Sequence, residues 1–146
     1  MLFRDASIGT SKYYSSKPSS YYSNKFEDST LDKYINTTWY GGLPADTKTF
    51  LSPLDYKIRL NNNQTATTIS RNACAISDSE HSSGNENWGS PLSYAGTLSL
   101  DTPYWTRTPT SGMADYARMI NTSNNIANSS VTTARNVRPT LGVLET

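Results

Sequence analysis

Hydrophobic residues recur at helical spacing in one part of the chain, at Leu31, Tyr34, Ile35 and Trp39. This spacing of three and four residues predicts an amphipathic helix. Asp28 or Ser29 can cap its first turn, Asp32 lies within that turn, and Gly41-Gly42 ends the helix. A second, shorter helix is predicted for residues 44–50, because a proline suits the first turn of a helix.

Elsewhere the pattern favours strands separated by polar loops. Apolar residues alternate with charged ones over residues 54–60, as in a strand with one exposed face. Further strands are predicted at residues 1–8, 67–76, 103–108, 114–120 and 137–144. A Ser- and Tyr-rich loop is expected at 10–25, a long irregular segment at 77–100, and an Asn-rich turn at 121–125. The prediction is an α+β fold with one main helix, small twisted antiparallel sheets and long irregular loops.

The length of the chain fits one domain, residues 1–146. A strand that begins at the first residue has no partner before it. This start indicates either a strand at the edge of a sheet or an excerpt, in which case the domain is the C-terminal part of a longer protein.

The charge of the chain narrows the range of partners. Thirteen basic and twelve acidic residues leave a net charge of +1, and no cluster of Lys and Arg marks a phosphate-binding face. We therefore expect no nucleic-acid partner. No apolar run is long enough to cross a bilayer, so membrane insertion is not expected. The N-terminus lacks the regions of a signal peptide, so export would need another route, such as cell lysis or a fusion partner.

Hydroxyl and amide groups supply most of the polarity. Ser, Thr and Asn number 21, 19 and 13, whereas charged residues make up 17% of the chain, against about a quarter in typical soluble domains. Such surfaces are common on extracellular β-rich proteins and on virion components. An ordinary loop-rich β domain with a hydrated surface is an equally weighted interpretation.

Arg107 and Arg138 each lie in a strand-like run with a proline close behind. Arginine is seldom fully buried unless its guanidinium group is paired. The two segments therefore predict buried, hydrogen-bonded arginines that pin a sheet beneath Trp105.

No reaction centre is assembled in the sequence. His81 is the only histidine and Cys74 the only cysteine, so neither an intrachain disulfide nor a zinc site is expected. A triad would have to be built around Asp78-Ser79-Glu80-His81, which lacks a nucleophile elbow and is interpreted as a solvated loop. Cys74 has apolar neighbours and is expected to be a small buried residue. We expect no enzymatic activity, no cofactor and no metal.

Two alternatives for the acidic residues stay open at this point. Oxygen ligands suited to calcium occur close together in the sequence at Asp78, Glu80, Asn85, Glu86, Asn87 and Asp101. No EF-hand spacing accompanies them, so solvated loop carboxylates are the favoured interpretation. Glu80 and Glu86 also offer a carboxylate pair of the kind that glycosidases use, but the sequence indicates no cleft around them.

Ten tyrosines and three tryptophans give the chain side chains that stack on sugars or anchor protein contacts. Trp39 and Trp105 are expected in the core. Trp88 is expected to anchor the long loop, with a surface platform as the alternative.

Three motifs in order carry a family resemblance. They are residues 28–40, with Leu31, Asn36 and Trp39-Tyr40, then Tyr104-Trp105-Thr106-Arg107-Thr108-Pro109, then Val137-Arg138-Pro139-Thr140-Leu141. The chain resembles a family of uncharacterised domains from gut bacteria and their phages, whose members read W-W-L-R-S-P and G-V-R-P-A-L in the last two places. Thr106, Thr108 and Asn136 depart from that pattern, at positions that affect packing and turn geometry.

The layout is also similar to C-type-lectin-like folds, which implies ligand contacts on exposed loops and on the hairpin. Carried onto this chain, the implied ligand-binding residues are Trp88, Tyr94, Tyr116, Arg118, Asn121, Asn124, Asn125 and Asn128. The family signature implies a structural framework of Trp105, Arg107, Val137, Arg138 and Pro139. The calcium and sugar motif of true C-type lectins, Glu-Pro-Asn or Gln-Pro-Asp, is absent, which argues against calcium-dependent sugar binding.

The resemblance leads to the expectation of a non-catalytic adhesion module on a phage tail, virion or bacterial surface protein. Its expected partner is a host surface glycan or protein, and it is expected to act as a homo-oligomer or within a multi-copy assembly. The alternative is a structural virion component, such as a capsid decoration or a baseplate or tail packing protein. An enzymatic role by analogy with formylglycine-generating domains is disfavoured by the single cysteine.

Overall fold

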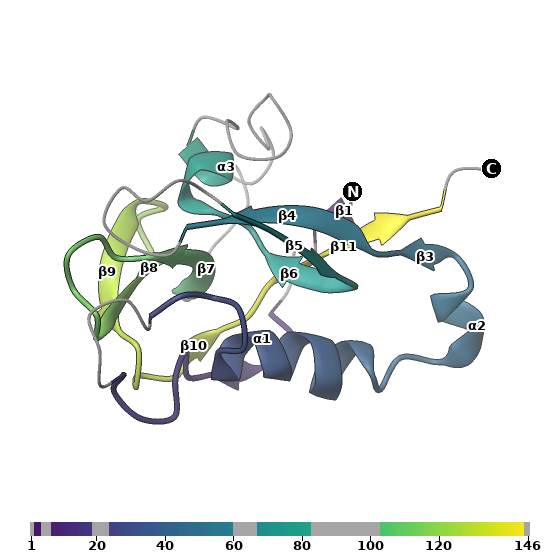
Figure 1. Ribbon diagram of the computed structural model, residues 1–146, viewed down its shortest axis with the longest axis horizontal. Coiled ribbons are helices and arrows are strands. Elements are labelled where there is room, and N and C mark those ends of the chain that lie inside the picture. Colours follow the sequence, from purple (N-terminus) through teal and green to yellow (C-terminus); the bar gives the residue numbers. More distant parts are fainter. Residues whose placement is uncertain (1, 4–6, 19–23, 60–66, 83–102, 145–146) are drawn as a thin grey trace.

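The computed structural model describes residues 2–3, 7–18, 24–59, 67–82 and 103–144. Over these residues the chain is mixed α+β, with mostly strands, a few short helices and several small sheets (Figure 1). The elements in order are β1 (Leu2–Phe3), β2 (Thr10–Ser11), α1 (Thr30–Lys33), η1 (Tyr34–Tyr40), α2 (Ala45–Lys48), β3 (Leu51–Ser52), β4 (Leu54–Ile58), β5 (Thr67–Arg71), β6 (Ala73–Ala75), α3 (Asp78–Ser82), β7 (Tyr104–Pro109), β8 (Tyr116–Ile120), β9 (Ile126–Ser130), β10 (Arg135–Asn136) and β11 (Pro139–Val143).

The predicted main helix is present as α1 followed directly by η1, a π-helical segment. Of the two capping residues considered, Ser29 is the N-cap, and its Oγ accepts a hydrogen bond from the backbone N–H of Asp32 at 3.0 Å. Asn36 donates its side-chain amide to the Asp32 carbonyl at 3.2 Å, the acceptor that the Asn36 N–H would use in an α-helix. This competition favours the wider π geometry of η1.

The central sheet is organised around β11, which pairs antiparallel with β1, β3 and β6. The helix formed by α1 and η1 runs along one side of β6, and the β4–β5 hairpin lies on the other side (Figure 1). Asn36 connects the helix to this sheet, because its amide donates to the Ala73 carbonyl and accepts from the Ala73 N–H. The alternation predicted for residues 54–60 is confirmed over β4, in which Tyr56 and Ile58 are buried and Asp55 and Lys57 are exposed.

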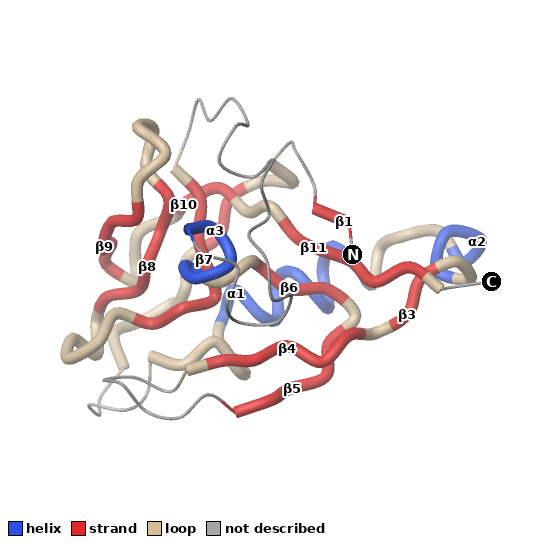
Figure 2. Tube along the Cα trace, turned by 90° about the horizontal axis from the view of Figure 1, so that it is seen from above, coloured by secondary structure: helices blue, strands red, loops and turns tan. Residues whose placement is uncertain are grey.

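The second sheet has five strands in the order β2-β10-β7-β8-β9. Only the β10–β7 pair is parallel, and the other three pairs are antiparallel. Within this sheet β9 forms one end, which Figure 2 shows at the outside of the molecule.

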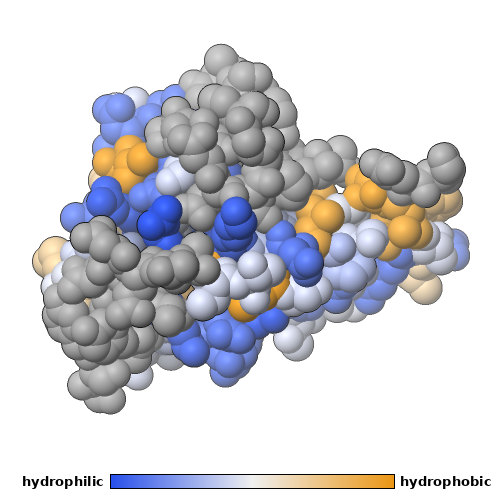
Figure 3. Space-filling model, turned by 45° about the horizontal axis from the view of Figure 1, so that its top comes forward, coloured by the Kyte–Doolittle hydropathy of each residue, from blue (hydrophilic) through white to orange (hydrophobic). Residues whose placement is uncertain are grey.

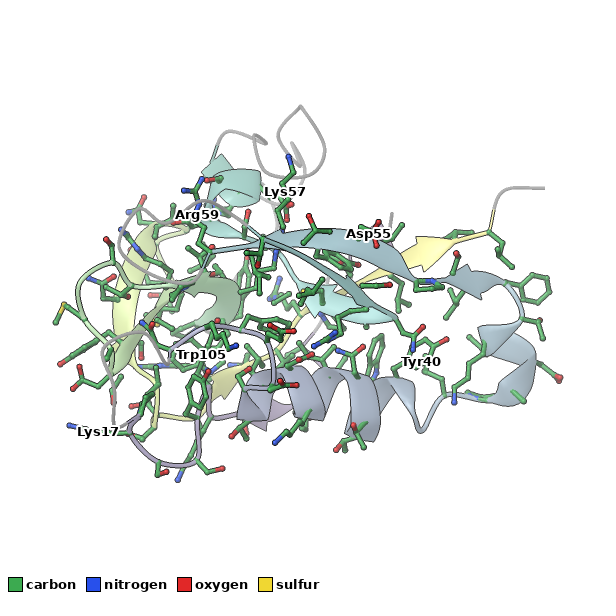
Figure 4. All side chains as sticks on the ribbon, in the orientation of Figure 1. Lys17, Tyr40, Asp55, Lys57, Arg59 and Trp105 are labelled. Carbon is green, nitrogen blue, oxygen red and sulfur yellow. The ribbon has the colours of Figure 1, made fainter. Side chains whose placement is uncertain are left out.

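The core lies between the helix and the two larger sheets. Trp105 is fully buried, with its ring against Tyr13 at 5.2 Å between centroids in an edge-on arrangement, and its indole N–H donates to the Ser11 carbonyl at 2.8 Å. Figure 4 shows Trp105 in the interior, between the helix and the sheet. The core position predicted for Trp105 is confirmed, while Trp39 is half-buried at the margin of the core.

Several predicted boundaries are wrong, and each has a local cause. The predicted strand 67–76 breaks at Asn72 into β5 and β6, which pair with different strands, β4 and β11. The predicted N-terminal strand is limited to β1 in the described residues, and β2 begins in the segment predicted to be a loop. The Asn-rich turn at 121–125 is confirmed. It connects β8 to β9, a strand that was not predicted because the sequence Asn128-Ser129-Ser130 is polar.

Candidate functional site

A buried ion pair joins the first residues of the long middle segment to the sheet. Arg107 on β7 donates from Nη1 and Nη2 to the two carboxylate oxygens of Glu80 on α3, both at 2.6 Å. The side chains are 1% and 0% exposed. Paired bidentate contacts of this kind are short and directional, so they fix α3 relative to β7.

The same guanidinium group ties β7 to two further strands. Its Nε donates to the Lys57 carbonyl of β4, and its Nη1 also donates to the Ala75 carbonyl of β6, each at 2.9 Å. Its Cζ lies 5.3 Å from the centre of the Tyr56 ring. The predicted burial and hydrogen bonding of Arg107 are therefore confirmed.

The other predicted framework residues also lie inside. Arg138 is 5% exposed, with its Cζ 5.1 Å from the centre of the Tyr104 ring, so its predicted burial is confirmed. Val137 is buried and exchanges backbone hydrogen bonds with the segment that precedes β2, and Pro139 begins β11 opposite Ala75.

The structure around Glu80 differs from the predicted solvated loop. The segment Asp78-Ser79-Glu80-His81, expected to be a solvated loop, is the helix α3. Ser77 and Glu80 form a reciprocal capping box: the Ser77 N–H donates to Glu80 Oε1 and the Glu80 N–H donates to Ser77 Oγ, both at 3.0 Å. The S-x-x-E spacing is visible in the sequence and was the signal that could have revealed this helix.

The polar side chains of α3 contact β7, β8 and the turn after β8. Asp78 Oδ1 accepts a hydrogen bond from Thr108 Oγ1 on β7 at 3.1 Å, and its Oδ2 lies 4.0 Å from Arg118 Nε on β8. His81 Nε2 is 3.0 Å from the side-chain oxygen of Asn124, in the turn after β8. Two residues predicted to bind ligand, Arg118 and Asn124, thus lie against α3.

The hairpin of β8 and β9 continues this surface. Arg118 is the register partner of Asn128, and Tyr116 is the register partner of Ser130. Asn128 is exposed, and its side-chain oxygen accepts from Thr110 Oγ1 at 3.0 Å. We call this surface the α3–β8–β9 polar face; it comprises Asp78, His81, Tyr116, Arg118, Asn124 and Asn128. The buried Thr108 and Thr110 support it from beneath.

The remaining predicted ligand residues have other places. Asn121 shapes the turn, because its side-chain oxygen accepts from the N–H groups of Ser123 and Asn125, both at 3.0 Å. Asn125 is exposed at that turn and its carbonyl accepts from the Asn121 N–H. Trp88 and Tyr94 lie outside the described residues.

The structure places the described residues that the sequence analysis considered for chemistry. Burial raises the pKa of the Cys74 thiol to about 12, with the cation of Arg107 opposing the shift, so the thiolate nucleophile does not form at neutral pH. His81 contacts an amide rather than a hydroxyl or thiol. Among the described residues no three His, Cys, Asp or Glu side chains gather as metal ligands, and of the candidate calcium ligands Glu80 is occupied by Arg107. Asn85, Glu86, Asn87 and Asp101 lie outside the described residues.

The protein-family model described as "Domain of unknown function (DUF6273)" matches residues 1–144. The chain belongs to the DUF6273 family. Comparison of this DUF6273 chain with curated proteins and with solved structures found no match. In the described part of the DUF6273 chain, none of the helices has the length and apolar character needed to span a membrane.

Sequence reasoning about the DUF6273 chain found the residues of the β8–β9 hairpin but missed their partners. Asp78 and His81 join the polar face because α3 packs on β7 and β8, while Thr108 and Thr110 support it through hydrogen bonds to Asp78 and Asn128. Those contacts are between residues about 18 to 43 positions apart, so no local pattern reports them.

Proposed function

We propose that this DUF6273 domain is a non-catalytic binding module that recognises a host surface glycan or protein through the α3–β8–β9 polar face. We further propose a C-type-lectin-like arrangement, in which exposed loops and a hairpin carry the ligand contacts. The module would belong to a phage tail, a virion or a bacterial surface protein, and it would act as a homo-oligomer or as one copy among many.

One observation carries the proposal: the buried Arg107–Glu80 pair that anchors α3. An anchored α3 holds hydrogen-bonding side chains from α3, β8 and the turn after β8 in one arrangement before any ligand arrives. Pre-organisation of this kind lowers the entropic cost of binding. Aromatic and amide side chains on such a surface suit sugar rings and polar peptides.

Display in many copies would make weak single sites effective, because linked sites raise the effective ligand concentration. We therefore design the test with tetramers of the domain on biotin-binding scaffolds, applied to surface-glycan arrays and to panels of bacterial cells. The test variant combines Asn124→Gly and Asn128→Ala, since glycine tolerates the positive φ of 62° at Asn124. The matched control is Thr37→Ala, an exposed polar residue on η1.

The proposal expects binding by the native tetramer and by the Thr37→Ala control, and loss of binding by the double variant. Absence of binding to every array and cell panel would refute it. Equal binding by the double variant would move recognition away from the α3–β8–β9 polar face.

A structural virion role is the second candidate, and one observation favours it. Phe50, Val143 and Leu144 are 69%, 44% and 49% exposed at the end of the molecule that carries α2 and β3, where Figure 3 shows apolar surface. Exposed apolar side chains gathered in one place favour contact with another protein. A density map of an assembled particle would separate the two roles: a polar face buried between subunits supports packing, and one that points away supports recognition.

A further inference from the structure

The α3–β8–β9 polar face contains one cationic side chain, Arg118, among its described residues. The Arg118 side chain is 35% exposed, and its one ion pair in the described residues is the Asp78 carboxylate, 4.0 Å from Nε. The two Nη groups, which form the other edge of the guanidinium fork, have no hydrogen-bond partner among the described residues. An ion pair this long and this exposed contributes little, about 0–1 kcal/mol.

Asn128 supplies a second donor beside this fork. Asn128 is exposed, and because its side-chain oxygen accepts from Thr110 Oγ1, its amide N–H₂ is the donor that it can offer to a ligand. Arg118 and Asn128 are register partners on β8 and β9, which places their Cβ atoms about 4.5–5.5 Å apart. Two neighbouring donors, one of them charged, match the two oxygens of a carboxylate.

Tyr116 lies two residues from Arg118 on the same face of β8. Its Cα is therefore about 6–7 Å away along the strand, which is roughly the width of one pyranose ring. Tyr116 is half-buried. An aromatic ring at this distance can stack on the sugar whose acidic group meets Arg118.

Building on the proposed function, we propose that the ligand is an acidic saccharide, with the carboxylate of a sialic or uronic acid bound by Arg118 and Asn128 and the sugar ring resting on Tyr116. Asp78 does not oppose this arrangement, because it lies on the Nε side of Arg118 and leaves the Nη edge to the ligand. Asp78 is itself fixed by a hydrogen bond from Thr108 Oγ1.

The test measures binding of defined saccharides by titration calorimetry and by ligand-observed NMR. The probes are sialyllactose and a galacturonic acid trimer, with lactose as the neutral counterpart. At least one acidic probe should bind about tenfold or more tighter than lactose, and rising NaCl should weaken that binding. Arg118→Gln should weaken it about ten- to hundredfold, and Arg118→Lys should restore only part of it.

Lys33→Gln is the matched control, because Lys33 is exposed on the helix and its loss changes the net charge by the same amount. This variant should bind like the native domain. Thermal unfolding of each variant shows whether the fold is retained. Asn128→Ala, which removes an exposed amide and the acceptor of Thr110 Oγ1, gives a second measurement of the contribution of the site.

Two failures are distinguishable. Binding of neutral glycans that Arg118→Gln leaves unchanged would overturn the acidic-ligand inference and leave the proposed function standing. Absence of binding to glycan arrays and cells as well as to the acidic probes would overturn both.

Discussion

Truncation of the buried glutamate, Glu80→Ala, tests the structural basis of the polar face. The variant removes both carboxylate acceptors of Arg107 and the acceptor of the Ser77 N–H, and it leaves a guanidinium that is 1% exposed without its counter-charge. Breaking one side of a buried ion pair costs about 3–5 kcal/mol. For a domain of this size that loss lowers the melting temperature by roughly 10 °C.

The assay is urea unfolding followed by near-UV circular dichroism, with Glu27→Ala as the control. Glu27 pairs with Lys25 at 3.6 Å on the surface, with both side chains more than a third exposed, so its loss should cost less than about 1 kcal/mol. A double-mutant cycle with Arg107→Met should give a coupling energy above about 2 kcal/mol. If Glu80→Ala costs no more than Glu27→Ala, the ion pair does not hold α3 in place and the reasoning is refuted.

Three further outcomes follow from buried groups. Burial raises the pKa of the Cys74 thiol to about 12, whereas a thiol in the unfolded chain ionises near about 8.5. Between these pH values only the unfolded state loses the proton, so the free energy of unfolding should fall as pH rises above about 8.5. The urea midpoint should be lower at pH 10 than at pH 7, and the difference should be smaller in Cys74→Ala. Gly142→Ala places a Cβ 2.3 Å from the Ser52 carbonyl oxygen, so it should cost about 1–3 kcal/mol in urea unfolding, and an unchanged midpoint would contradict the β3–β11 pairing. The fully buried Asn24 side chain donates to three carbonyls in the turn of residues 110–116, between β7 and β8. Asn24→Ala should lower the free energy of unfolding by about 1–3 kcal/mol and speed amide hydrogen exchange in this turn; unaltered exchange would show that Asn24 does not hold the turn.

The elements best predicted from sequence are those with a strong local pattern. The helix around Leu31 and the strand at Leu54–Ile58 follow from periodicity, since each buries one face against the core. The α3 helix was missed although its capping box is local, because only five residues are helical and they sit at the start of a polar stretch. The strand β9 was missed because Asn128, Ser129 and Ser130 have low strand propensity and are held by pairing with β8.

The candidate site was predictable in part. Hairpin residues such as Arg118 and Asn128 were found by resemblance, and the burial of Arg107 followed from its apolar neighbours. The identity of the partner of Arg107 did not follow, because Glu80 lies 27 residues away in sequence and in a segment whose composition is typical of solvated loops. Long-range pairing of this kind is a property of the packed state rather than of any window of sequence.

The placement of β10 and β11 constrains when this domain can fold during synthesis. These strands pair with β1, β2, β3, β6 and β7, and the pairing of Leu2 with Leu141 spans nearly the whole chain. A nascent chain that ends before residue 135 therefore lacks β11, the central strand of its sheet, and the apolar residues of β6 have no strand beside them. Contacts so distant in sequence slow the search for the native state, so β6 stays without its partner strand during synthesis until residues 135–144 have left the ribosome.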